Sequence, residues 1–557
     1  MASFKKTFLQ RFALFIITGI IFIFLIGKIA VVYAQTDGQS AISVNPEQVL
    51  LPISPTFFGM NLYWSTHGME SSYGGYDYAD EVVGLLGELG LDTIRFPAGC
   101  SADAYKWDHN FPSPPPGNEW FSYGLSIDQY LSLTQILEND PYYTINMQEG
   151  HLNPDNCINA VEYPGTIAEA RELAAYIKDR LPNKPKYYWE LSNEPWGWPN
   201  WNLQDYVSRA RLYAQAIKEV LPNSRFTWSW AIKGTTPNEA LGEWQQMIDY
   251  LDQNSAGLFD TLQFHDYYGL FHFNVSETPL VDSWAKQRLD ILQQLLANTN
   301  SQPEIDVTEF NVWCDGQNYA CGTVSHLLAI AQIYRQYLLH QVSFAHLHGG
   351  IHEATSPCEY CGAHIISGGG PFWGRVNIPP EPQPIYFVQK LLADHIGAEI
   401  VSAESGVEKV DVLISKDQQV LYILVINKNN AIKALPIKIN RFQLSSPARA
   451  FVIGKGSRPH SLLDLGAKNI RSGYVDVEDD LVKFYAEPYS VSVVEIDYQA
   501  GCLGDLNEDG VIGIGDLLGL LDQWGSCSSD CQADLNEDGV VAIQDLLKLL
   551  DNWGGCI

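Results

Sequence analysis

The strongest constraint on the fold is an alternation of short apolar strands with amphipathic helices over residues 55–395. Eight segments rich in β-branched and aromatic residues are separated by stretches with helical periodicity. Eight strands that alternate with helices are the pattern of a (β/α)8 TIM barrel, so we predict an α/β fold of that kind. A doubly wound open sheet is the alternative, but no glycine-rich phosphate loop follows the first strand. The predicted strands are 57–63, 92–97, 142–147, 187–192, 225–231, 261–267, 305–310 and 343–348, and the predicted helices include 80–89, 166–181, 204–220, 279–297 and 324–340.

The pattern changes after the barrel, where short alternating strands follow one another with turns between them. This pattern predicts a β-sandwich over residues 398–499. The extended segment 41–50 precedes the barrel and is a candidate strand of the same sandwich. Because the sandwich has no cluster of catalytic residue types, we interpret it as a structural brace, with an independent sugar-binding module as the alternative. Its predicted strands are 410–415, 420–427, 448–453, 482–486 and 490–497.

The last sixty residues contain an internal repeat. The sequence Asp-Leu-Asn-Glu-Asp-Gly at 505–510 recurs at 534–539, and each copy continues into Leu-Leu-x-Leu-Leu-Asp-x-Trp-Gly. Oxygen-bearing side chains at loop positions one, three, five and twelve, with glycine at six, match the calcium loop of an EF-hand. Position twelve is Asp instead of the usual Glu. The predicted Ca²⁺ ligands are Asp505, Asn507, Asp509, Val511 and Asp516 in the first loop, and Asp534, Asn536, Asp538, Val540 and Asp545 in the second, the two valines through their backbone carbonyls.

A calcium loop followed by one helix, present twice, resembles the dockerin module of cellulosomal enzymes over about residues 502–557. The resemblance implies Ca²⁺-dependent folding of a small α-helical tail and docking onto a cohesin-type scaffold protein. Two alternatives stay open: a calcium-stabilised tail without a docking partner, and an Asp/Asn-rich turn that binds no metal.

The amino terminus has the layout of a secretory signal peptide. Basic residues precede an apolar run over 12–27, and Val32-Tyr33-Ala34 supplies small residues at the expected cleavage positions. We therefore predict that residues 1–34 are removed and that the protein is secreted or displayed at the cell surface. An uncleaved membrane anchor is the alternative, because apolar residues continue beyond Lys28.

Charge and cysteine content agree with an exported protein. The 65 acidic and 34 basic residues give a net charge of −31, which argues against nucleic acid and anionic membranes as partners. Six of the ten cysteines lie within residues 100–361 and four in the tail, and even numbers favour disulfides in an oxidising compartment. Their pairing does not follow from the sequence.

Two glutamates stand at the carboxyl ends of predicted barrel strands. Glu194 lies just after the fourth strand, in Asn-Glu-Pro, and Glu309 ends the seventh. Active sites of (β/α)8 barrels form at this end of the strands. Cleavage of a glycosidic bond needs one carboxylic acid with a raised pKa and one ionised carboxylate. A strand-end glutamate is more commonly solvated or salt-bridged, but two of them in this arrangement predict a glycosidase, which needs no cofactor for catalysis.

The sequence around these glutamates resembles known enzymes. Asn193-Glu194-Pro195 is similar to the acid/base signature of the (β/α)8 clan A of retaining glycosidases. The segments 94–99, 264–267 and 308–313 resemble motifs of the α-L-arabinofuranosidase family, glycoside hydrolase family 51. The resemblance implies that Glu194 is the acid/base, that Glu309 is the nucleophile, and that Asn193 contacts the sugar. The further candidates for substrate binding are Arg95, His265, Tyr267, Asn146, Trp313 and Trp373.

Departures from that family leave the sugar open. Ala98 and Phe310 replace a glycine and a tryptophan of its motifs, and 59–61 lacks a substrate-contacting glutamate. Glu190 and Asp306 alternate with the catalytic face, so we predict buried polar contacts for them. Histidines near the eighth strand (His346, His348 and His352) are predicted to line the pocket or contact the substrate, with a metal site as the alternative.

We therefore predict a signal peptide (1–34), a catalytic barrel (35–397), a sandwich (398–499) and a dockerin-like tail (500–557). The expected function is retaining hydrolysis of plant-type polysaccharides or oligosaccharides, with α-L-arabinofuranosidase-like action. The alternatives are a β-xylosidase, a glucuronidase or an endo-glycanase of a sister family, and a catalytically inactive carbohydrate-binding protein.

Overall fold

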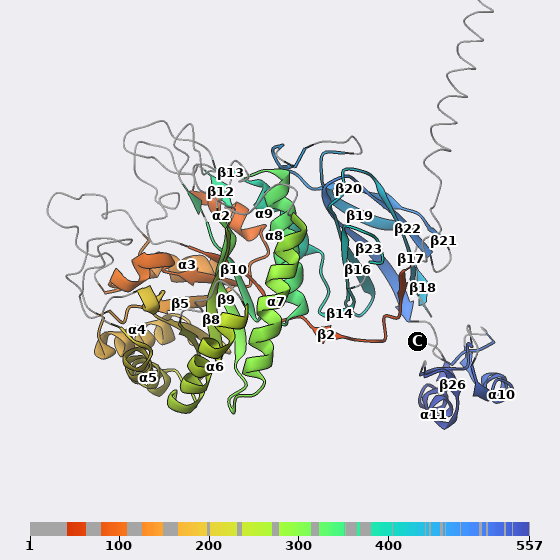
Figure 1. Cartoon of the computed structure of the whole chain (residues 1–557), viewed down its shortest axis with the longest axis horizontal. Coiled ribbons are helices and arrows are strands. Elements are labelled where there is room, and N and C mark those ends of the chain that lie inside the picture. The colour runs from red at the N-terminus through yellow and green to blue at the C-terminus, as the bar shows by residue number, and fades with distance from the viewer. Residues whose placement is uncertain are drawn as a thin grey trace, which may run out of the picture.

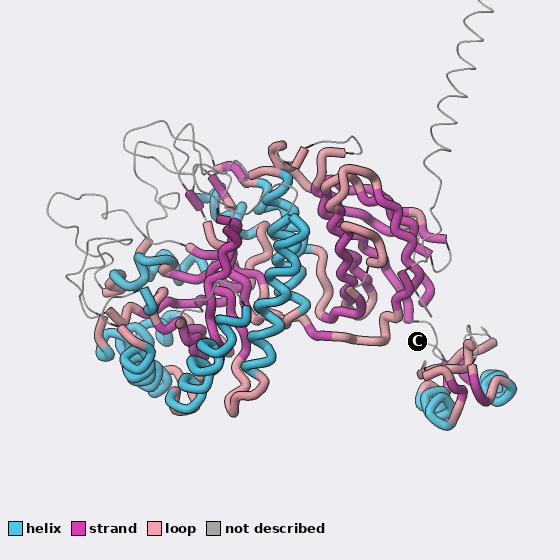
Figure 2. The backbone as a smooth tube through the Cα atoms, in the orientation of Figure 1, coloured by secondary structure: helices cyan, strands magenta, loops and turns pink. Residues whose placement is uncertain are grey.

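The structure is a computed structural model of the chain, shown in Figure 1 and, by secondary structure, in Figure 2. It describes residues 42–62, 79–108, 125–148, 165–197, 201–230, 237–269, 278–313, 322–349, 351–352, 365–367, 380–403, 405–439, 442–444, 447–456, 461–462, 464–478, 481–500, 504–507, 511–527, 531–536 and 538–555. The leader 1–34, Trp373 and Asp509 lie outside these residues. Among the described helices, none is long and apolar enough to span a membrane.

Eight parallel strands close into a barrel in the order β10-β3-β4-β5-β6-β7-β8-β9. Each predicted barrel strand is present, with bounds shifted by a few residues. Most strand residues are buried because one strand face points into the barrel interior and the other packs under the surrounding helices. The strands are β3 (Phe58–Asn61), β4 (Thr93–Phe96), β5 (Asp140–Ile145), β6 (Tyr187–Leu191), β7 (Ser224–Ser229), β8 (Thr261–Gly269), β9 (Glu304–Trp313) and β10 (Phe344–Leu347).

Helices follow the barrel strands, and side-chain caps fix where several of them begin. Thr166, Asn202 and Thr323 each accept a hydrogen bond from the backbone N–H three residues later, and Ser126 forms a full capping box. The helices are α2 (Ala79–Gly87), α3 (Ile127–Ile136), α4 (Ile167–Arg180), α5 (Leu203–Val220), α6 (Pro237–Asn254), α7 (Thr278–Leu296), α8 (Val324–Leu339) and α9 (Pro384–Asp394), with the short 3-10 turns η2 (Gly99–Ala104) and η4 (Pro195–Gly197).

Two sheets form the sandwich beside the barrel, and the larger is antiparallel whereas the smaller is mixed (Figure 1). The larger sheet has the order β2-β14-β15-β16-β23-β19-β20, with β18 paired to β23, and the smaller has the order β1-β17-β22-β21. The strand β1 pairs parallel to β17, so the segment before the barrel joins the sandwich. The strands are β1 (Ile42–Val44), β2 (Leu51–Pro52), β14 (Glu399–Ser402), β15 (Val410–Lys416), β16 (Val420–Asn427), β17 (Lys433–Ile439), β18 (Phe442–Leu444), β19 (Ala448–Ile453), β20 (Arg471–Val475), β21 (Val477–Glu478), β22 (Leu481–Ala486) and β23 (Ser490–Ala500).

The barrel helix α8 lies against the sandwich strands β16 and β23, which explains why it is buried on nearly all sides. From this helix the Arg335 guanidinium donates hydrogen bonds to the carbonyls of Val412 and Ala403 in the sandwich. These contacts agree with the predicted role of the sandwich as a brace. A small sheet of β11 (Ile351–His352), β12 (Ile366–Ser367) and β13 (Glu381–Pro382) lies after β10 in the chain.

The tail consists of two short helices joined by crossed strand pairing. The strand β24 of the first repeat pairs with β27 at the end of the second, and β25 pairs with β26. Buried apolar residues from both repeats, including Leu520 and Leu549, share one small core. A disulfide joins Cys527 and Cys531 between the repeats. The elements are β24 (Val511–Ile512), α10 (Ile514–Asp522), β25 (Gly525–Ser526), β26 (Val540–Val541), α11 (Ile543–Asp551) and β27 (Gly554–Gly555).

Candidate active site

Arg95 on β4 is the centre of a polar network at the carboxyl end of the barrel. Its guanidinium is fully buried and donates four hydrogen bonds of 2.6–2.8 Å. Because a guanidinium is planar and always charged, it fixes the direction of every acceptor around it. The acceptors are Glu190 Oε2, Asn61 Oδ1, Glu309 Oε1 and Asn193 Oδ1, which come from four different parts of the barrel.

Glu190 on β6 forms an ion pair with Arg95 and balances its charge. The Thr144 hydroxyl donates to Glu190 Oε2 at 2.6 Å, and the Thr308 hydroxyl donates to Oε1 at 2.9 Å. Both oxygens of this fully buried carboxylate therefore have donors. A buried ion pair with its remaining lone pairs satisfied tolerates the loss of water.

The strand β9 carries a β-bulge at Thr308. In the pairing with β8, Val307 lies opposite Phe264 and Glu309 lies opposite His265, so Thr308 is an extra residue. The pairing with β10 also shifts by one residue between Val307 and Phe310. Asp306 contacts Thr227 and Thr308 contacts Glu190 inside the barrel. Strict alternation would then turn Glu309 outward, and the extra residue turns it inward instead.

Glu309 is buried and surrounded by positive charge and hydrogen-bond donors. Arg95 Nη1 lies 2.8 Å from Oε1, the Tyr267 hydroxyl donates to Oε2 at 2.6 Å, and His265 and His348 lie 3.4 and 3.3 Å from Oε2. Burial alone would raise the pKa of Glu309, but the charges of His265, His348 and Arg95 hold that pKa well below its usual range. Glu309 is therefore ionised at neutral pH.

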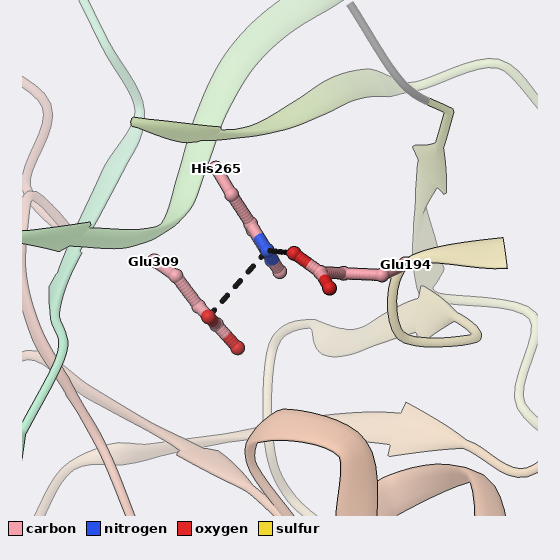
Figure 3. Close-up of side chains that lie close together, drawn as sticks. All are labelled: Glu194, His265 and Glu309. Atoms are coloured by element: carbon pink, nitrogen blue, oxygen red, sulfur yellow. Dashed lines mark hydrogen bonds and ion pairs between the residues drawn. The ribbon is translucent and has the colours of Figure 1, made fainter. Parts of the chain in front are cut away.

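Glu194 lies on a tight turn after β6. Ser192 and Glu194 both adopt positive φ values, 72° and 46°, which are uncommon for residues other than glycine. The Glu194 carboxylate is 40% exposed, and its Oε1 lies 2.7 Å from Nδ1 of His265 (Figure 3). Burial alone would lower the pKa of His265, but the carboxylates of Glu309 and Glu194 raise it. The Trp196 indole packs edge-on against the same imidazole at 5.7 Å.

His265 lies between the two glutamates and contacts both (Figure 3). One ligand-type atom from each of Glu194, His265 and Glu309 lies within 4.8 Å of the others, an arrangement that can geometrically hold a metal ion. Glu309 is already bonded to Arg95 and Tyr267 and lies in contact with both histidines, so a metal ion would have to displace contacts that the structure holds. The arrangement of one ionised buried carboxylate facing one half-exposed carboxylate suits acid–base and nucleophilic chemistry better.

The structure brings together most of the predicted site residues. Asn193, Arg95, His265 and Tyr267 all lie in the network around the two glutamates. The Asn146 side chain instead bonds to backbone groups of Tyr105 and Gln148, so a substrate contact there stays a prediction.

Two of the predicted aromatic contacts cannot be placed. Trp313 ends β9, and nothing is described of its side chain. Trp373 lies outside the described residues.

Residues outside the predicted substrate contacts complete the network. Asn61 donates to the backbone carbonyls of Thr308 and His346 while it accepts from Arg95. The sequence signalled this residue only as a departure from a family motif. His348, predicted to line the pocket or contact the substrate, lies against Glu309, whereas His346 is buried beside Thr93.

The acidic loops of the tail fold around their last aspartate. Asp516 accepts hydrogen bonds from the backbone N–H groups of Leu506, Asn507 and Gly513, and Asp545 accepts equivalent bonds from Asn536 and Ala542. Both carboxylates are fully buried.

The predicted calcium ligands of the second loop that the structure describes lie close together. Asp534, Asn536 and Asp538 hydrogen-bond to one another or to the loop backbone. This set of hard oxygen donors fits the preference of Ca²⁺.

Comparisons with known proteins show the fold. No protein-family model matches the chain, and no curated protein matches it. An α-L-arabinofuranosidase from Thermotoga maritima, solved with arabinose, is similar with a TM-score of 0.62 at 17% identity over 82% of this chain and 99% of that chain. A family 51 α-L-arabinofuranosidase from Bifidobacterium longum gives 0.58 at 14% over 82% and 99%. A family 44 xyloglucanase from Paenibacillus polymyxa gives 0.57 at 12% over 83% and 100%.

Proposed function

We propose that this protein is a retaining glycoside hydrolase with Glu309 as nucleophile and Glu194 as acid/base. One observation carries the proposal: a buried carboxylate bonded to Arg95 and Tyr267 faces a half-exposed carboxylate across His265. One oxygen from each glutamate lies within 4.8 Å of the other. Retaining enzymes hold their two carboxyl groups about 5–5.5 Å apart, whereas inverting enzymes leave about 6.5–9.5 Å for a water molecule.

The proposed mechanism proceeds in two displacements. Glu194 donates a proton to the glycosidic oxygen while Glu309 attacks the anomeric carbon, which forms a glycosyl-enzyme and releases the alcohol. A water molecule then loses its proton to Glu194 and attacks the same carbon, which frees Glu309 and the sugar with retained configuration. The bonds from Arg95 and Tyr267 keep Glu309 anionic and direct its oxygens before the reaction begins.

For the substrate, we propose α-L-arabinofuranosides of plant-type polysaccharides or oligosaccharides. The fold resembles two α-L-arabinofuranosidases over their whole length, and the motifs around Arg95, His265 and Glu309 resemble the same family. A β-glycan such as xyloglucan is the second candidate, because the fold also resembles a xyloglucanase and the segment 59–61 lacks the substrate-contacting glutamate of the arabinofuranosidase motif.

Hydrolysis of an aryl glycoside panel tests the catalytic proposal. The panel contains 4-nitrophenyl α-L-arabinofuranoside, β-xyloside, β-glucuronide and β-glucoside, with xyloglucan assayed by reducing ends. We expect cleavage of at least one substrate by wild type and a loss of about 10⁴-fold or more in Glu309→Ala. The matched control is Glu304→Ala, at the opposite end of the same strand. The proposal fails if the folded wild-type protein cleaves none of them, or if Glu309→Ala retains the activity of Glu304→Ala.

For the tail, we propose that the two loops bind Ca²⁺ and that the module docks onto a cohesin-type partner. Support comes from the oxygen atoms that the loops bring together and from large apolar side chains that both repeats leave exposed in matching positions. An exposed apolar patch of this kind is typical of an interaction surface. The matched pairs, each 41–69% exposed, are Val511 and Val540, Ile514 and Ile543, Leu518 and Leu547, Leu521 and Leu550, and Trp524 and Trp553.

Binding to an immobilised cohesin domain tests the docking proposal. We expect calcium-dependent capture of the full chain and its loss in Leu518→Asp/Leu547→Asp, which changes both exposed faces. A chain that binds Ca²⁺ but is not captured by any cohesin of a representative set refutes docking and leaves a calcium-stabilised tail. Export through the leader 1–34 also stays part of the proposal, and the mature amino terminus of the secreted protein tests it.

A further inference from the structure

The turn that carries Glu194 is held from a different part of the chain. Asp103 lies on η2, the 3-10 turn after β4, and is 4% exposed. Its Oδ1 accepts a hydrogen bond from the Ser192 hydroxyl at 2.8 Å and another from the backbone N–H of Asn193 at 3.1 Å. Both donors belong to the two residues that immediately precede Glu194.

This turn needs external support because its backbone is unfavourable. Ser192 and Glu194 both have left-handed φ values, 72° and 46°, although neither is glycine. Such conformations persist where surrounding contacts impose them, and they gather at functional sites. Within the turn, the described backbone hydrogen bond of Ser192 reaches only the carbonyl of Glu190, two residues earlier. The two bonds to Asp103 join the backbone of this turn to η2, the turn that follows β4.

Asn193 is bonded through both its side chain and its backbone to β4 and to the turn η2 that follows β4. Arg95 on β4 donates to its side-chain oxygen at 2.7 Å, and Asp103 on η2 accepts from its backbone N–H. Arg95 also binds Glu309. The segment from Arg95 to Asp103 thus sets the position of the nucleophile directly and the position of the Glu194 turn through Asn193.

We propose that Asp103 is a positioning residue for the acid/base, which holds the Ser192–Glu194 turn so that the Glu194 carboxylate meets the departing oxygen. This inference rests on the proposed role of Glu194 as general acid. Asp103 touches no reacting atom, and it acts by fixing the backbone from which Glu194 extends. Small displacements of a catalytic group lower rates strongly, by roughly 100-fold for 1 Å.

The dependence of the rate on the leaving group separates this role from a general loss of structure. Protonation by Glu194 matters for a poor leaving group such as phenol and matters little for 2,4-dinitrophenol, which departs as an anion. We compare kcat/KM for phenyl and 2,4-dinitrophenyl glycosides of the sugar that wild type cleaves. For Asp103→Ala we expect a loss of roughly 100-fold on the phenyl glycoside and less than about 3-fold on the dinitrophenyl glycoside.

Two further variants act as controls. Asp103→Asn retains an oxygen that can accept from both donors, so we expect it to keep wild-type kcat/KM within about 3-fold on both substrates. Glu194→Ala should show the same leaving-group pattern as Asp103→Ala, with a larger loss. If Glu194→Ala lacks the pattern, the proposed acid role fails. If only Asp103→Ala lacks it, or loses activity equally on both substrates, the positioning role is overturned.

Crystal structures of Asp103→Ala and Asp103→Asn supply a readout that does not depend on activity. The expected result is that the 2.7 Å contact between Glu194 and His265 is lost in Asp103→Ala and kept in Asp103→Asn. Should Asp103→Ala not fold, Ser192→Ala removes one of the two bonds and takes its place. An unchanged turn in the variant that lacks these bonds overturns the proposal.

Discussion

Replacement of Arg95 by methionine tests whether the buried charge network stabilises the barrel. Arg95→Met replaces the aliphatic part of the arginine side chain by one of similar shape, but it removes all four hydrogen bonds and the ion pairs to Glu190 and Glu309. Removal of one partner from a buried ion pair costs about 3–5 kcal/mol, because the other charge stays buried without compensation. Glu190 keeps the hydroxyl of Thr144 and Glu309 keeps that of Tyr267. We therefore expect the lower end, about 3 kcal/mol.

Urea unfolding followed by tryptophan fluorescence measures this loss, since Trp189 and Trp228 are fully buried in the barrel. The matched control is Arg171→Met, which breaks an ion pair with Glu219 whose side chains are 52% and 61% exposed. That surface pair should contribute about 0–1 kcal/mol. In Arg95→Met/Glu190→Gln the two losses should not add, with a coupling of about 2 kcal/mol.

The reasoning is refuted if Arg95→Met lowers the unfolding free energy by no more than Arg171→Met does. It is also refuted if the losses from Arg95→Met and Glu190→Gln add fully. Activity gives an independent check. Because Arg95 is one of the charges that lower the pKa of Glu309, the acid limb of kcat/KM should move to higher pH in any Arg95→Met protein that stays folded.

Three further predictions concern single groups. Tyr267→Phe removes the donor to Glu309 Oε2 and should lower kcat/KM about 10-fold, with the acid limb at higher pH; an unchanged pH profile would contradict this. The pKa of His265 is raised in the folded protein, so the stability that His265 contributes is present below its ordinary pKa of about 6.5 and is lost as the pH rises through the raised pKa. The urea midpoints of wild type and His265→Gln should therefore converge as the pH rises. A constant difference between the two midpoints over the whole pH range would contradict this prediction. Removal of Ca²⁺ by EDTA should lower the unfolding free energy of the tail by about 5 kcal/mol relative to Ca²⁺ at 100 times Kd, because each of the two sites contributes about 2.7 kcal/mol. In calorimetry the transition of the tail should move to lower temperature and that of the barrel should not change, and in Asp516→Ala/Asp545→Ala the tail transition should no longer respond to EDTA.

The order of elements could be predicted from the sequence because most barrel strands are short runs rich in β-branched and aromatic residues. The positions of Glu194 and Glu309 followed from the same pattern, since both stand where a predicted strand ends. Helix α6 (Pro237–Asn254) was not among the predicted helices named. It begins at a proline, and its apolar face is about as pronounced as that of α5, so the sequence did carry a signal for it.

Contacts between distant residues could not be predicted in the same way. The predicted buried polar contacts of Asp306 and Glu190 are confirmed, but the bulge at Thr308, which turns Glu309 to the same side as Asp306, was not predicted. A bulge leaves no composition signal in a strand without glycine. Asp103 bonds to the Glu194 turn, although β5 and β6 lie between the two segments in the sequence. Nothing in either segment indicates that it contacts the other.

The crossed pairing of the tail means that its two repeats are not separable modules. Gly554 and Gly555 pair with Ile512 and Val511, so the strand that follows the first acidic loop is completed by the last described residues of the chain. A premature stop codon after Asn552 would leave both acidic loops intact in the sequence and still remove half of that strand pair. Gene truncations or tags at this end should therefore be designed as changes to the first repeat as much as to the second.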